Sequence, residues 1–148
     1  MAAVTAGALR CFGSDQNDIA AVVRSDVPVD NLSFAYFRRV LLGERQFWSS
    51  NLKVTLLMRA PGARERDVLL RSVYQMSEAQ FRQYWIAKVF RAEASSGPRI
   101  VYSNEMALEL ALAVPGALAC IDSMQIPKGL KTLKISGTLP GDKAYPLR

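Results

Sequence analysis

Short apolar runs alternate with segments of helical periodicity along most of this chain, and this alternation restricts the fold more than any other feature. Apolar runs typical of strands occupy residues 19–23, 54–58, 100–102 and 117–121, and residues 132–136 alternate like a half-buried strand. Helical periodicity fills the stretches between them. Because these connections are long enough for crossovers, we expect an α/β fold with a largely parallel sheet flanked by helices.

Four helices are expected between these strands. Ser33 is placed to cap the first, and residues 63–74 form the second. Ser77 and Gln80 form a capping-box pattern at the start of the third. Asn104 is expected to cap the fourth.

Aromatic residues at helical spacing predict part of the core. Phe81 and Trp85 lie on one face of the third helix and are expected to be buried rather than to form a binding face. Residues 45–51 are expected to be a loop in which Phe47–Trp48 covers the strand ends. Cys120 lies in an apolar run and is expected to be a buried, inert thiol.

The composition excludes several classes of function. The 148 residues include no histidine, and the two cysteines lie far apart, so the commonest metal ligand and any zinc-binding spacing are missing. No catalytic motif stands out, and we expect no enzymatic activity, metal or cofactor. The formal net charge of +6 is spread along the chain, which argues against nucleic-acid binding. No apolar stretch reaches the ~18–20 residues of a membrane span.

Residues 1–17 differ from the rest of the chain. They are small and mildly apolar, but they lack the basic start and the long apolar middle of a complete secretory signal. A trimmed or mis-started signal and a disordered leader both remain open. We expect residues 18–148 to form the folded domain.

Residues 55–70 (TLLMRAPGARERDVLL) combine a strand, a Pro61–Gly62 corner and a helix start, an arrangement that makes anion sites in α/β proteins. Arg59 stands at the end of the strand. Arginines and carboxylates alternate over residues 64–67, and acidic residues in a first helical turn already complement the helix dipole. A solvated loop with local ion pairs is therefore favoured over an oxyanion site.

Four fragments occur in an order that resembles one protein family. They are residues 32–48, 79–90, 115–122 and 130–148, and they resemble the corresponding parts of type II periplasmic binding proteins of the phosphate-binding branch. The resemblance covers roughly Asp18 to Arg148. The matching positions are Leu42–Gly43, Trp48, Tyr84–Trp85, Pro115–Gly116–Ala117 and Tyr145–Pro146–Leu147.

The resemblance implies one lobe of such a protein, as in a short, single-lobed member. In the phosphate binders the loop after the strand is similar to Arg-x-x-x-Ser-Gly-Thr. Arg59 matches the arginine, whereas Ala63, Arg64 and Glu65 stand at the Ser, Gly and Thr places. The implied ligand-binding residues are therefore Arg59, Gly62, Ala63, Arg64 and Glu65, with two hydroxyl donors missing and a carboxylate added.

Two functional hypotheses follow. The first is a periplasmic or secreted, non-enzymatic domain of the phosphate- or oxyanion-binding type, with ligand binding weakened or lost. The alternative is a protein-interaction module in which a lone lobe contacts a partner protein or a second copy, with no small-molecule ligand. An intracellular nucleic-acid-binding domain is a distant third.

Overall fold

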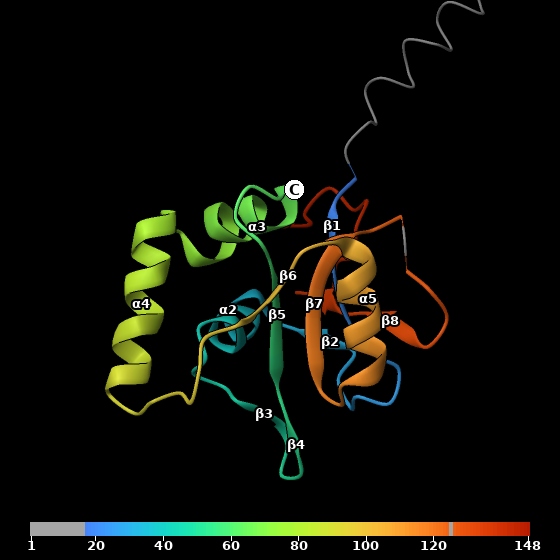
Figure 1. Cartoon of the computed structure of the whole chain (residues 1–148). Helices are drawn as coiled ribbons and strands as arrows, with labels where there is room; N and C mark the ends of the chain where they lie inside the picture. The colour runs from blue at the N-terminus through green and yellow to red at the C-terminus, as the bar shows by residue number, and fades with distance from the viewer. Residues whose placement is uncertain (1–16, 125) are drawn as a thin grey trace, which may run out of the picture.

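The computed structural model describes residues 17–124 and 126–148, and strands alternate with helices along them (Figure 1). The expectation for residues 1–17 falls, apart from Asn17, outside the described residues. The strands are β1 (Ile19–Arg24), β2 (Asn31–Leu32), β3 (Phe47–Ser49), β4 (Leu52–Lys53), β5 (Thr55–Arg59), β6 (Arg99–Val101), β7 (Ala117–Asp122), β8 (Leu130–Thr132) and β9 (Lys134–Ile135). The helical elements are α2 (Phe34–Leu41), α3 (Arg64–Leu69), the π-helical turn η1 (Leu70–Tyr74), α4 (Glu78–Phe90) and α5 (Asn104–Ala113).

The central sheet has five strands in the order β6-β5-β7-β1-β8. Strand β5 pairs in parallel with both β6 and β7, while β1 runs antiparallel to β7 and to β8. All strands of this sheet except β1 therefore run in the same direction. The expected α/β fold, with a largely parallel sheet flanked by helices, is confirmed.

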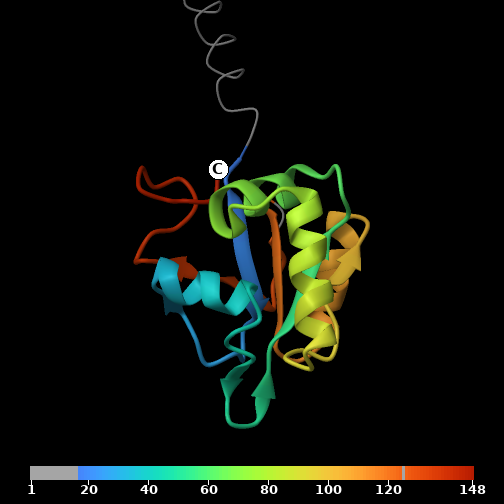
Figure 2. The ribbon, with the colours of Figure 1, turned by 90° about the vertical axis from the view of Figure 1, so that its left-hand side faces the viewer.

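Side chains of β1 alternate between two apolar clusters, one on each face of the sheet. Ile19, Ala21 and Val23 belong to the cluster under α2, η1 and α4. Ala20 and Val22 belong to the cluster under α5. The two views show α5 on the opposite side of the sheet from α2 and α4 (Figures 1 and 2). A strand buried on both faces explains why residues 19–23 are continuously apolar.

Helix α4 follows its sequence signals. Ser77 accepts a hydrogen bond from the Gln80 amide, and the Gln80 side chain accepts one from the Ser77 amide, so the capping box is present. Phe81 and Trp85 are buried, as expected. Cys120 is buried as well, and burial raises the pKa of its thiol to about 12, which leaves little reactive thiolate near neutral pH.

Two expectations about strands and loops are wrong. Residues 132–136 do not form one strand: β8 pairs with β1 and β9 pairs with β2, and the chain changes sheet between them. Residues 45–51 are not only a loop, because β3 begins a hairpin with β4. Trp48 is buried there and donates from Nε1 to the Gly116 carbonyl at 2.8 Å, whereas Phe47 is exposed.

The helical expectations also need two corrections. The segment 63–74 is helical, but it divides into α3 and the π-helical turn η1, which ends where Gln75 adopts a left-handed conformation. The cap of α5 is Ser103, whose hydroxyl accepts from the Met106 amide, and Asn104 is instead the first helical residue. Within the described ranges, no helix combines the length and the apolar character needed to cross a membrane.

Candidate functional site

The Pro-Gly corner lies where β5 and β6 end side by side. These strands are parallel, with Arg59 opposite Val101, so the segments that follow them leave the sheet at the same edge. The Ala60 amide donates to the Val101 carbonyl at 3.0 Å and continues the pairing past the strand. Asn104, three residues after Val101, therefore reaches the same corner as Arg59.

Arg59, Glu65 and Asn104 form a closed polar cluster at this edge. The Arg59 Nη1 donates to Glu65 Oε1 at 3.1 Å and to Asn104 Oδ1 at 2.8 Å. The Asn104 Nδ2 donates to the second Glu65 oxygen at 3.1 Å. The side chains of Arg59 and Glu65 are only 17% and 10% exposed. The arginine expected to face an oxyanion therefore already binds a carboxylate of its own chain.

The other expected site residues have separate surroundings. Arg64 donates from Nη2 to the Asn17 carbonyl at 2.5 Å, on the approach to β1. Gly62 has a φ of 96°, which a glycine adopts without strain. The Ala63 amide donates to the Ala60 carbonyl at 3.2 Å, within the turn. The structure thus brings Arg59 and Glu65 together, while Arg64 binds elsewhere.

Arg66 is a structural arginine rather than part of a solvated loop. Its side chain is 3% exposed and binds the Glu78 carboxylate through Nε and Nη2, at 2.7 Å and 2.8 Å. It also donates to the Arg59 carbonyl at 3.0 Å and lies 4.9 Å from the centre of the Phe81 ring. Arginine–carboxylate pairs are present as expected, but each has a partner that is largely shielded from solvent, and they connect β5, α3 and α4.

The Arg66–Glu78 pair predicts a pH-dependent contribution to stability. Hydrogen bonds from Arg66 lower the pKa of the Glu78 carboxyl below its usual value. A lowered folded-state pKa stabilises the protein above the unfolded-state value of about 4.3, and this stabilisation is lost as pH falls through the folded-state value. We expect Glu78→Gln to cost about 1 kcal/mol at pH 6, because the Glu78 side chain is 35% exposed and water screens the pair. The cost should be smaller at pH 3. Urea denaturation of both proteins measures this difference.

Glu105→Gln provides the matched control, because Glu105 is exposed and forms no ion pair among the described residues. Its unfolding free energy should differ little from the original protein at either pH. A Glu78→Gln cost that is the same at pH 6 and pH 3 would contradict the assignment of the pH dependence to this pair.

Asn104 is the residue of this corner that sequence reasoning missed. It was expected to cap a helix, which explained its presence without any contact to Arg59. One feature of the sequence could have indicated this contact: Asn104 follows β6 closely, and β6 runs parallel to β5, which ends in Arg59. Since parallel strands end at one edge of a sheet, polar residues after either strand are candidates for one cluster.

The corner can hold an anion only beside or in place of Glu65. The guanidinium supplies charge, and the amides at the start of α3 supply donors. No group of histidine, cysteine and carboxylate side chains in the described part of the chain is arranged to hold a metal ion. The chemistry of the corner is thus that of charged hydrogen bonding.

No protein-family model matches the chain, and no curated protein matches it in sequence. Eight chains of solved structures match this chain in fold, and three of them illustrate the similarity. A phosphate transport receptor from Vibrio cholerae has a TM-score of 0.70 at 16% identity and is matched over 88% of this chain. PstS from Borrelia burgdorferi has a TM-score of 0.66 at 19% identity over 84% of this chain. A putative phosphate ABC transporter substrate-binding protein with bound phosphate, from Clostridium perfringens, has a TM-score of 0.66 at 15% identity over 82%.

These matches define the fold of the chain. It spans about half the length of each solved structure, between 46% and 53%. The fold is therefore that of about half of a phosphate-binding protein of this kind, in agreement with the resemblance read from the sequence. The similar structures are substrate-binding proteins of transporters rather than enzymes.

Proposed function

We propose that this chain is an extracytoplasmic, non-enzymatic domain of the phosphate- or oxyanion-binding type whose affinity for a free oxyanion is weakened or lost. The observation that carries the proposal is the ion pair of Arg59 with Glu65 at 3.1 Å. The descriptions of the similar structures name phosphate transport, and one contains bound phosphate, which supports the oxyanion class.

The proposed ligand contacts are the Arg59 guanidinium and the backbone amides of residues 62–65, of which the Ala63 amide must first leave the Ala60 carbonyl. An incoming oxyanion must displace the Glu65 carboxylate or bind next to its negative charge. Ala63 and Glu65 also supply no neutral hydroxyl donor. Because a charged hydrogen bond contributes about 1.5–3 kcal/mol, the loss of two donors weakens binding by about 10²–10⁴-fold.

Titration calorimetry with inorganic phosphate at low ionic strength tests the proposal. We expect a dissociation constant no tighter than about millimolar, with a strong salt dependence. Arg59→Ala should remove this binding, whereas Arg71→Ala, a change of an exposed arginine of η1, should leave it unchanged. Micromolar binding would contradict the weakened site, and equal binding by Arg59→Ala would contradict its location.

The alternative function is a protein-interaction module with no small-molecule ligand. The closed Arg59–Glu65–Asn104 cluster favours it, since the charge of the arginine is already neutralised within the chain. If neither the original protein nor Arg59→Ala binds phosphate or sulfate, this alternative becomes the better account.

A further inference from the structure

An apolar stripe lies on the outer face of α4 and is not covered by any other described part of the chain. Ile86, Val89 and Phe90 are 61%, 39% and 89% exposed. Their spacing of three and four residues places them next to one another on the helix. Single exposed apolar residues are common on protein surfaces, but a contiguous group is typical of an interaction site.

The stripe borders a shallow apolar groove that is largely open to solvent. Trp85 and the three stripe residues line one side, and residues 95–97 line the other. A second cavity of about 200 Å³ shares Trp85 and residues 95–97 and extends to Lys53 and Arg99. The groove and the cavity are therefore neighbours, and two cationic residues are among those that line the cavity. The cavity lies at the start of β5, the opposite end of this strand from Arg59.

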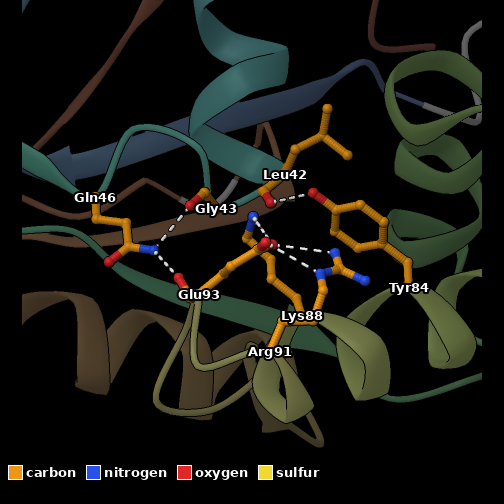
Figure 3. Close-up of polar contacts among 7 residues, drawn as sticks. All are labelled: Leu42, Gly43, Gln46, Tyr84, Lys88, Arg91 and Glu93. Carbon is orange, nitrogen blue, oxygen red and sulfur yellow. Dashed lines mark hydrogen bonds and ion pairs between the residues drawn. The ribbon is translucent and has the colours of Figure 1, made fainter.

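The charges around the groove are predominantly positive. Glu93, the nearest carboxylate along the chain, is neutralised by Arg91 at 3.0 Å and by Lys88 at 3.7 Å (Figure 3). Lys53 and Arg99 form no ion pair with any carboxylate that the structure describes. The surface therefore offers apolar contact and unpaired positive charge side by side.

We propose that this groove binds a segment of a partner protein in which apolar side chains stand next to carboxylates. The apolar side chains pack against Trp85 and the stripe, and the carboxylates pair with Lys53 and Arg99. A second copy of the chain is a poor occupant, because copies with a net charge of +6 repel one another. The proposal is independent of oxyanion binding at Arg59.

Selection of a random displayed peptide library on the full chain tests this proposal. Enriched peptides should combine apolar residues with Asp or Glu. When resynthesised and titrated by fluorescence anisotropy, they should bind Phe90→Ser and the double variant Lys53→Glu/Arg99→Glu at least about tenfold more weakly. Tyr102→Ser and Lys143→Glu, which change an exposed aromatic and an exposed cation elsewhere, should bind as the original protein does. Circular dichroism checks that each variant is folded.

Three results would overturn the proposal. One is the absence of enriched peptides, or enriched peptides without carboxylates. Another is equal binding by Phe90→Ser. The third is a different occupant: a dimer in sedimentation velocity that Phe90→Ser dissociates, or binding to phosphatidylglycerol vesicles that Phe90→Ser abolishes.

Discussion

Replacing Trp85 with alanine is expected to lower the free energy of unfolding by about 3–5 kcal/mol, as large aromatic truncations in cores do. Trp85 is 7% exposed, and its ring packs edge-on against the Tyr84 ring, with the two ring centres 5.4 Å apart. A Cβ added at Gly43 would lie 2.7 Å from the Trp85 ring, so the backbone there approaches the indole closely.

Chemical denaturation measures this loss, and Phe90→Ala on the same helix is the matched control. Phe90 is 89% exposed, so its truncation should change the unfolding free energy by less than about 0.5 kcal/mol. Trp85→Phe should cost less than Trp85→Ala, because the buried Nε1 has no described hydrogen-bond partner to lose. A loss below about 1 kcal/mol for Trp85→Ala would show that this face of α4 does not anchor the helix.

Features determined by nearby residues were predictable from the sequence. The capping box of Ser77 and Gln80 and the helical spacing of Phe81 and Trp85 predict α4 and its buried face, and both are confirmed. The continuous apolar run at 19–23 predicts a strand, and β1 is that strand. In each case the spacing of apolar residues in the sequence indicates which side chains are buried. Side chains on one face of a helix recur about every 3.6 residues, and those on one face of a strand every 2.

Features that depend on distant partners were not predictable. Residues 132–136 look like one strand, yet their pairing partners are β1 and β2, about a hundred positions earlier in the chain. The sequence indicated that Trp48 covers strand ends, but not that its indole donates to the Gly116 carbonyl, 68 positions later in the chain. Local propensity carries no information on which distant backbone group completes a hydrogen bond.

In the candidate site, too, features set by neighbouring residues were predictable and contacts between distant segments were not. The strand, corner and helix start predicted the place of Arg59, since these elements are consecutive. The contacts of Arg59 with Asn104 and of Arg66 with Glu78 join different elements. Alternating arginines and carboxylates indicated ion pairs, but not that Arg66 would be buried, because it lies against Glu78 and Phe81 of α4.

Replacing Glu65 with threonine is expected to lower stability and to strengthen phosphate binding. Threonine is the residue at this place in the phosphate binders that the sequence resembles. Arg59 is 17% exposed, and it loses its carboxylate partner while it keeps the hydrogen bond to Asn104 at 2.8 Å. Leaving a largely buried charge without its counter-ion should lower the unfolding free energy by about 3 kcal/mol. Removing the competing carboxylate and adding a hydroxyl donor should strengthen phosphate binding by about 10–100-fold.

Calorimetry with phosphate and thermal denaturation with and without phosphate measure both effects. Phosphate should raise the melting temperature of Glu65→Thr more than that of the original protein, because a ligand that binds the folded state stabilises it. Asp67→Asn is the control, since it removes the same charge from an exposed position of α3. If Glu65→Thr binds phosphate no better than Asp67→Asn, Glu65 does not block the corner. An unchanged unfolding free energy would show that its pairing with Arg59 contributes nothing to the fold.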